Sequence, residues 1–262
     1  MPSRIAPLFI GHGSPNLIAQ PLHNMSIFLS TLSTQIHPKA IVIFTAHWEE
    51  SIENRGVSIS FHENEYKTMH DFQGFSKLSH VSYPAKGSPE TAQLVETKLN
   101  QNGIKTRREY DRGLDHGSWV VLGLMFPDSN IPIVQCSIDP TSSAETHFKI
   151  GKALKELSEM EILVIASGGT VHNLLETNSK KKKTERWAEE FDNWLIDKIS
   201  QWNLKELFSY REHAPHHQLA IPRSEHFLPL FIVMGMAQDE TSGKVLFRQY
   251  DFGSLSYLSF SF

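Results

Sequence analysis

The chain has 262 residues, and 40% of them are hydrophobic, which is enough to fill the core of one large domain. It carries 25 basic and 29 acidic side chains, and the resulting net charge of −4 argues against nucleic acid as a partner. The only cysteine is Cys136, so no intrachain disulfide and no thiolate metal cluster can form. No stretch resembles a membrane span or a signal-peptide core, and we therefore expect a soluble, cytoplasmic protein without a membrane partner.

Strand-like and helix-like segments alternate along the chain. Apolar or β-branched runs predict strands at 7–10, 40–45, 57–61, 104–109, 131–138, 162–166, 245–250 and 255–260. Helical spacing and capping residues predict helices at 21–34, 89–100, 142–158 and 184–199. The polar stretch 62–84 is expected to be a long functional loop or lid. This alternation predicts an α/β fold, with helices on both faces of a mixed, mostly parallel sheet.

Four histidines stand in distinctive local contexts. His12 lies between two glycines directly after an apolar run, and His47 ends the strongest strand pattern in the chain. His172 follows the small residues of a Ser-Gly-Gly-Thr turn, and His226 lies at the expected start of a helix. Each could alone be a structural histidine. Imidazole is the commonest metal-binding side chain, however, and loops at strand ends carry the chemistry of α/β proteins. Together the four predict a mononuclear metal site, and a site shared by His12 and His226 implies a single domain over residues 1–262.

Six motifs follow one another from residue 11 to residue 230. They are Gly11-His12-Gly13-Ser14-Pro15, Ala46-His47-Trp48, Tyr66-Lys67-Thr68-Met69-His70-Asp71-Phe72-Gln73-Gly74-Phe75, Arg112-Gly113-Leu114-Asp115-His116-Gly117-Ser118-Trp119, Ser167-Gly168-Gly169-Thr170-Val171-His172-Asn173-Leu174 and Glu225-His226-Phe227-Leu228-Pro229-Leu230. In combination they resemble the DODA-type, class III extradiol aromatic ring-opening dioxygenases. That family is related to the catalytic subunit of protocatechuate 4,5-dioxygenase. The resemblance implies a three-layer α/β/α sandwich and an oxidoreductase that opens a DOPA-like or other substituted catechol with O2.

The same resemblance assigns roles to five histidines. His12, His47 and His226 match the positions that hold one divalent metal ion. His172 matches a histidine close to that ion, which serves as a fourth ligand in some zinc-loaded forms and as a catalytic acid–base residue. His116 matches a catalytic histidine beside the bound substrate, and Asp115 or a backbone carbonyl could fix its tautomer.

The implied chemistry agrees with these residue types. Ring opening needs a redox-active ion with open positions for a catecholate and dioxygen, so we expect Fe(II) to support activity. Nitrogen ligands also bind zinc tightly, so Zn(II) is expected in purified protein. An imidazole titrates in the range needed to take a proton from a phenol and to return one later. We expect a monomer or a small homo-oligomer.

One stretch departs from the family pattern. Several family members carry a His-Pro pair linked to substrate handling where this chain has Ile221 and Pro222. The departure argues against DOPA itself as the natural substrate, unless His216 or His217, which lie a few residues earlier, replaces the missing histidine.

Three other functions are consistent with parts of the sequence. A zinc-dependent metallohydrolase could use three histidines to activate water, with Glu225 or Glu49 as the general base. A tetrapyrrole metal chelatase could also carry Gly-His-Gly-Ser after its first strand, although the motifs around His116 and His226 are not expected there. A non-catalytic metal-binding protein is the remaining alternative.

Overall fold

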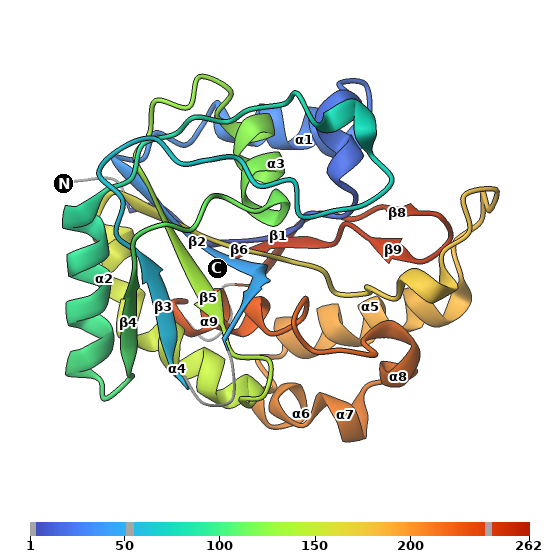
Figure 1. Ribbon diagram of the computed structural model, residues 1–262. Helices are drawn as coiled ribbons and strands as arrows, with labels where there is room; N and C mark the ends of the chain where they lie inside the picture. The colour runs from blue at the N-terminus through green and yellow to red at the C-terminus, as the bar shows by residue number, and fades with distance from the viewer. Residues whose placement is uncertain (1–3, 51–54, 239–242) are drawn as a thin grey trace.

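A mixed sheet of eight strands runs through the middle of the molecule in the computed structural model, which describes residues 4–50, 55–238 and 243–262 (Figure 1). The strand order is β4-β3-β5-β2-β6-β1-β10-β7. The strands are β1 (Leu8–Gly11), β2 (Ala40–Glu49), β3 (Val57–Ser60), β4 (Thr106–Glu109), β5 (Ile133–Ile138), β6 (Ile162–Gly168), β7 (Lys244–Phe247) and β10 (Ser259–Ser261). A separate two-stranded pair is formed by β8 (Tyr250–Asp251) and β9 (Leu255–Ser256).

The four central strands of the large sheet, β5, β2, β6 and β1, are parallel. Val42 of β2 lies opposite Val134 of β5 on one side and Val164 of β6 on the other. Antiparallel pairing occurs toward the edges, between β3 and β5 and between β10 and both of its neighbours. The predicted mixed, mostly parallel sheet is therefore confirmed, and the carboxyl ends of its central strands meet at one edge.

Alternate residues of the central strands enter two separate hydrophobic cores. Ile41 and Ile43 of β2 belong to one core, whereas Val42 and Phe44 belong to the other. Side chains point alternately to the two faces of a sheet, so a strand that is covered on both faces must be apolar throughout. This burial explains why the sequence of β2 has no polar residue between Ala40 and Phe44.

Helices cover both faces and complete the three layers (Figure 1). One face is covered by α1 (Asn24–Ser33) and α3 (His116–Met125). The other is covered by α2 (Pro89–Gln101), α4 (Ala144–Leu154), α5 (Arg186–Ser200) and α9 (Pro229–Gly235). The short helices α6 (Leu204–Phe208) and α8 (His217–Ala220) pack beside α5, and α7 (Tyr210–His213) packs against both of them. The α/β/α layering agrees with the fold expected from the sequence.

The sequence did not predict α3. Eight of its ten residues are buried, so the segment has no polar face and lacks the amphipathic pattern that indicates a surface helix. Its start is nevertheless encoded locally, because the carboxylate of Asp115 accepts a hydrogen bond from the backbone N–H of Ser118 at 3.1 Å. The helix begins at His116, which fixes that residue beside the carboxyl ends of the strands.

The C-terminal strands also differ from the prediction. The segment expected as one strand at 255–260 divides into β9, which pairs with β8, and β10, which pairs with β1. The chain reverses between β8 and β9 through Phe252 and Gly253, which both adopt positive φ angles. Pairing with two different partners requires the chain to bend between them, and apolar alternation alone does not record that bend.

The stretch 62–84 forms the long loop that the sequence predicted, with a single short 3-10 turn, η3 (Ser76–Leu78). It is held over α3, where the indole N–H of Trp119 donates to the carbonyl of Met69 at 2.8 Å.

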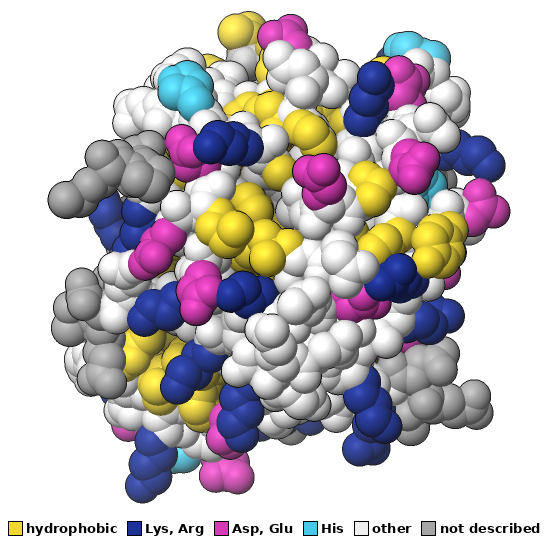
Figure 2. Space-filling model, turned by 90° about the vertical axis from the view of Figure 1, so that its left-hand side faces the viewer, with side chains coloured by type: hydrophobic (Ala, Val, Ile, Leu, Met, Phe, Trp, Pro, Cys, Tyr) yellow, Lys and Arg dark blue, Asp and Glu magenta, His cyan; other side chains and the backbone are white. Residues whose placement is uncertain are grey.

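Figure 2 views the molecule from the side of α2 and the edge strand β4, where basic, acidic and apolar side chains are interspersed. Charged residues on an edge strand, such as Arg107 and Arg108 of β4, oppose pairing with another chain. Within the described ranges, no helix is both long and apolar enough to cross a bilayer.

Candidate metal centre

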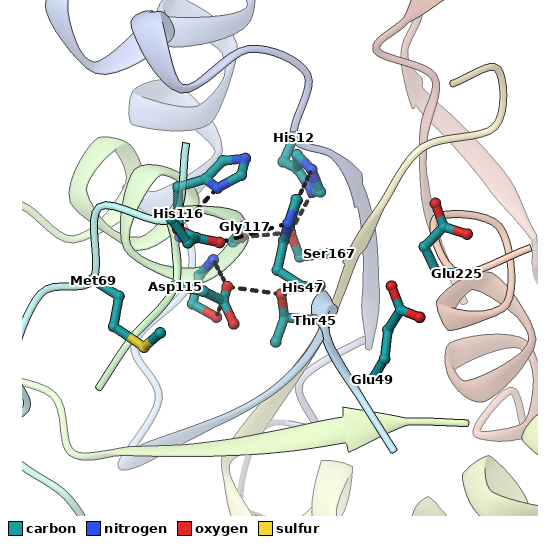
Figure 3. A network of polar contacts seen from close by, with 12 residues as sticks. His12, Thr45, His47, Glu49, Met69, Asp115, His116, Gly117, Ser167 and Glu225 are labelled. Atoms are coloured by element: carbon teal, nitrogen blue, oxygen red, sulfur yellow. Dashed lines mark hydrogen bonds and ion pairs between the residues drawn. The ribbon is translucent and has the colours of Figure 1, made fainter. Parts of the chain in front are cut away.

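Three of the predicted histidines meet at the carboxyl edge of the central strands. His12 directly follows β1, His47 lies near the end of β2, and His226 lies in the turn between α8 and α9. One ring nitrogen of each lies within 4.8 Å of those of the other two. His226 was expected at the start of a helix, but α9 begins three residues later at Pro229. Figure 3 shows His12 and His47 facing one another beside Ser167 and Gly117.

The spacing of these nitrogens fits a shared ion. The Nε2 atoms of His12 and His47 are 3.2 Å apart. Two ligands bound to one tetrahedral ion at about 2.0–2.1 Å would be separated by roughly 3.3 Å. The Nε2 atom of His226 is buried and has no hydrogen-bond partner among the described residues, although a buried polar nitrogen normally has one. An ion between the three rings would satisfy that nitrogen.

Hydrogen bonds fix the tautomers of two of the rings. The hydroxyl of Ser167 donates its only hydrogen to the carbonyl of Gly117 at 2.5 Å, so its oxygen must accept from Nδ1–H of His12 at 2.9 Å. The carboxylate of Glu225 likewise accepts from Nδ1 of His226 at 3.2 Å. In both neutral rings the lone pair therefore lies on Nε2, the atom that faces the centre. Such partners are typical of metal-binding histidines.

The electrostatics keep the imidazoles neutral. Burial lowers the pKa of His12 and His226 well below the ordinary histidine value, and repulsion from neighbouring imidazoles adds to this. Burial and the nearby His116 bring the pKa of His47 down to about 3, while burial, His47 and His116 bring that of His172 to about 4. Neutral imidazole is the form that binds a metal ion, so burial prepares the ligands for binding.

Two glycines allow the close packing at this centre. A Cβ atom on Gly168 would lie 2.1 Å from the carbonyl oxygen of His226, and a Cβ on Gly117 would lie 2.8 Å from Cδ2 of His47. The backbone N–H of Gly169 donates to that same carbonyl of His226 at 2.8 Å. Because Gly168 and Gly169 have no side chains, the turn that carries His226 can pack directly against the end of β6.

His116 lies beside the three-histidine group and is oriented by Asp71. Its ring centroid is 3.9 Å from that of His47. One carboxylate oxygen of Asp71 accepts from the backbone N–H of His116 at 2.9 Å and contacts Nδ1 of the same residue at 3.0 Å. The other oxygen lies 3.6 Å from Nδ1 of His47. Burial alone would raise the pKa of Asp71, but the hydrogen bonds from His116 bring it down to about 2, so the carboxylate is charged.

The sequence had suggested Asp115 or a backbone carbonyl as the partner of His116, and this suggestion was wrong. Asp115 instead accepts from the hydroxyl of Thr45 at 2.8 Å and pairs with Arg112 at 3.0 Å, besides capping α3. An N-cap side chain is directed at the first turn of its own helix and so is turned away from the ring of the next residue. Asp71 was part of a quoted motif, yet it lies 45 positions before His116 in an irregular loop, and no local pattern linked the two.

His172 lies outside the group of three converging nitrogens. Its ring stacks on that of His226 with centroids 3.5 Å apart and planes 7° apart. A ring nitrogen of His172 comes within 4.8 Å of both the Glu225 carboxylate and a nitrogen of His226. The structure thus places His172 next to the candidate metal centre, stacked against the ring of His226.

The other histidines of the sequence analysis lie elsewhere. His216 forms an ion pair with Glu190 at 2.7 Å, and Nδ1 of His213 bonds to the carbonyl of Ser209 at 3.1 Å. His217 lines a cavity of about 880 Å³ together with Ile221 and Glu225. Of His213, His216 and His217, His217 is therefore the one that shares a cavity with Ile221.

The geometry agrees with comparisons to known proteins. Residues 21–259 match the family described as the catalytic LigB subunit of aromatic ring-opening dioxygenase. The chain is 34% identical to 4,5-DOPA dioxygenase extradiol of Beta vulgaris, over 97% of this chain and 95% of the other. It is 35% identical to 4,5-DOPA dioxygenase extradiol of Escherichia coli K12, over 98% and 94%.

A solved structure agrees with the sequence relatives. The crystal structure of an uncharacterized protein from Escherichia coli K12 superimposes with a TM-score of 0.81 at 31% identity, covering 98% of this chain and 99% of that one. The family match spans most of the chain and includes the segments that carry His47, His116, His172 and His226. This chain belongs to the family of the catalytic LigB subunit of aromatic ring-opening dioxygenases.

Proposed function

We propose that this protein is an extradiol dioxygenase that opens the ring of a substituted catechol with O2 at a single metal ion held by His12, His47 and His226. The convergence of the three ring nitrogens within 4.8 Å is the observation that carries this proposal. The family match favours ring opening over hydrolysis and over metal insertion into a tetrapyrrole. One domain, spanning residues 1–262, would supply the whole site.

Iron in the ferrous state is the ion that we propose for activity. Held by the imidazoles of His12, His47 and His226, it would supply a redox-active Lewis acid for the reaction of a catecholate with dioxygen. Three neutral imidazoles leave the charge of a divalent ion uncompensated, which favours an anionic catecholate next to it.

The neighbouring histidines would handle the protons. His172 lies against the His226 ring and would take a proton from a catechol hydroxyl, then return it to the dioxygen-derived oxygen atom that leaves when the O–O bond breaks. His116 would accept a hydrogen bond at Nε2 from a substrate hydroxyl, because its Nδ1 carries the proton that the Asp71 carboxylate accepts. Loop 62–84 contributes Phe72, whose ring packs edge-on to that of His116 at 5.5 Å and helps to exclude water.

The test begins with metal-free protein that is reloaded with ferrous iron without air. A catechol is then added, followed by oxygen, and the absorption spectrum is recorded. A yellow ring-opened semialdehyde is the expected product. Zinc-loaded protein is the control, because zinc has no accessible redox change. Ester or peptide hydrolysis by the zinc form, with no ring opening by the iron form, would support the hydrolase alternative instead.

A further inference from the structure

A carboxyl group lies on the buried face of α5. Ala188, Asp192, Leu195 and Ile199 follow one another at helical spacing and are all buried, but Asp192 alone among these four is polar. Burial raises the pKa of this carboxyl above the ordinary aspartate value. An apolar side chain would fill the position without the cost of burying a carboxylate, so the groups that Asp192 binds must explain its presence.

Three hydroxyl groups donate to Asp192, and they come from three different segments. Thr170, in the turn after β6, donates to one oxygen at 2.7 Å. Tyr250 of β8 and Ser256 of β9 donate to the other oxygen, at 2.7 and 2.6 Å. Figure 1 shows the β8–β9 pair beside α5. The carboxylate therefore joins the helix, the two-stranded pair and the turn that leads to His172.

Arg248 compensates the charge of this carboxylate through Tyr250. Its Nε and Nη2 donate to the hydroxyl oxygen of Tyr250 at 2.9 and 2.8 Å, which leaves the hydroxyl proton for Asp192. The guanidinium is itself held on α5, by the side chain of Asn193 at 2.7 Å and the carbonyl of Glu189 at 3.2 Å. Buried networks that are fully hydrogen-bonded are rigid, so this one gives the turn after β6 a fixed point of attachment.

The ring of His172 is oriented differently from its neighbours. His12, His116 and His226 each have a ring nitrogen bonded to the side chain of another residue. Over residues 4–50, 55–238 and 243–262, no side chain forms a hydrogen bond with the ring of His172, which lies stacked on that of His226. The direction of the His172 ring therefore depends on the backbone of the turn that carries it.

Hydrogen bonds hold that turn at three successive residues. The carbonyl of Val171 accepts from the backbone N–H of Ser256 at 3.2 Å, and the N–H of His172 donates to the carbonyl of Ala220 at 2.9 Å. Thr170 adds the side-chain attachment to the buried carboxylate, two residues before His172. Release of the Thr170 hydroxyl would therefore let the imidazole shift from the ring on which it stacks.

We infer that Asp192 is a positioning residue for the proposed acid–base group, and that it acts on the ring of His172 through the hydroxyl of Thr170. The inference rests on the proposed function for the role of His172, and it adds a residue that acts through another side chain. The buried carboxylate of α5 thereby fixes the distance between the imidazole and a catechol hydroxyl. Proton transfer depends on that distance, because the two groups must lie within hydrogen-bond reach.

Replacement of Thr170 tests this more cleanly than replacement of Asp192, because Asp192 also holds the β8–β9 pair. Thr170→Val keeps the shape of the side chain and removes its hydroxyl. The first readout is the NMR spectrum of the zinc-loaded full chain with labelled histidines. Stacking on His226 shifts the ring protons of His172 upfield, so in Thr170→Val we expect them to move downfield while those of His12 stay in place. Thr170→Ser, which retains the hydroxyl, should restore the wild-type positions.

Turnover supplies the second readout. With iron-loaded protein and a catechol, kcat of Thr170→Val should fall about 10–100-fold, the scale of a displaced catalytic group, while KM and metal content change little. Thr170→Ala gives the same comparison with no methyl group placed against the carboxylate, should the valine variant fail to fold. Unmoved His172 resonances, or an unchanged kcat in the folded variant, would overturn the inference.

Tyr250→Phe is the matched control. It removes one hydroxyl from the same carboxylate, but Ser256 still donates to that oxygen and the bond from Thr170 remains. Its His172 resonances and kcat should match those of the wild type, and a change equal to that in Thr170→Val would refute a specific route through Thr170. The expected shift in Thr170→Val without ring opening by the wild type contradicts the proposed function alone, whereas ring opening with unmoved resonances contradicts this inference alone.

Discussion

Asp71 and His116 are joined by two contacts, from the backbone N–H and from Nδ1 of the histidine to one carboxylate oxygen, at 2.9 and 3.0 Å. The second oxygen of Asp71 reaches toward His47. The long loop 62–84 is thereby linked to the metal centre by a charged group, which fixes both the tautomer and the direction of the His116 ring.

Asp71→Asn should therefore impair catalysis more than metal binding. An amide would direct an N–H group or a weaker acceptor at Nδ1 of His116, so the ring would lose its fixed orientation. Turnover should fall by roughly 10–100-fold, the usual effect of altering such a supporting residue. Metal content by elemental analysis, measured beside oxygen uptake, checks this. The control is Asp111→Asn, because the side chain of Asp111 is exposed. An equal loss of turnover in both variants would argue against the role of Asp71.

His12→Ala should remove metal and activity together. His12 supplies one of three converging nitrogens, and the remaining two would hold an ion poorly. The metal content of the purified variant should be close to zero after dialysis, with its secondary structure retained by circular dichroism. A variant that keeps a full complement of metal would show that His12 is not a ligand.

His172→Ala should separate proton transfer from metal binding. Three other histidines remain to hold the ion, so most of the metal should be retained. Turnover should fall by about 10²–10⁴, the range that is usual for a lost acid–base group. Loss of metal as complete as in His12→Ala would make His172 an essential ligand. Full activity with full metal would direct the search for the base to His116.

Gly168→Ala and Gly169→Ala form a matched pair of adjacent substitutions. A Cβ at Gly168 would meet the carbonyl of His226 at 2.1 Å, whereas a Cβ at Gly169 would have its nearest neighbour, in His172, at 3.6 Å. Gly168→Ala should therefore displace the His226 turn and lower metal affinity by at least about tenfold, the scale of a perturbed supporting contact. Gly169→Ala should bind metal normally. A competition titration with a coloured chelator measures the metal affinity of each variant. Equal metal affinities in the two variants would show that the contact between Gly168 and His226 does not matter for metal binding.

The sequence predicted the central strands and drew attention to the histidines that meet at their carboxyl edge, for a simple reason. Strands buried on both faces must be apolar throughout, and a histidine at the end of such a strand stands out. The position of His47 was slightly misjudged, because β2 continues through it to Glu49. Strand ends are determined by pairing with neighbouring strands, and apolar character alone does not mark them.

The supporting contacts were much harder to predict. Asp71 reaches His116 from an irregular loop, and Ser167 orients His12 from a position 155 residues away. Such contacts depend on how distant segments meet in space, and neither periodicity nor spacing in a single sequence records them. The cavity that His217 lines is of the same kind, because α8, the end of β2 and the turn before His226 form it together.

The stoichiometry of oxygen uptake distinguishes ring opening by this protein from other oxidations of a catechol. Iron-loaded protein is mixed with a limiting amount of a catechol in an oxygen electrode, and dissolved oxygen, remaining catechol and hydrogen peroxide are all measured. We expect one dioxygen to be consumed for each catechol lost, with a ring-opened yellow product and no peroxide. Oxygen uptake that yields peroxide and a quinone, or no oxygen uptake by protein fully loaded with ferrous iron, would contradict this expectation.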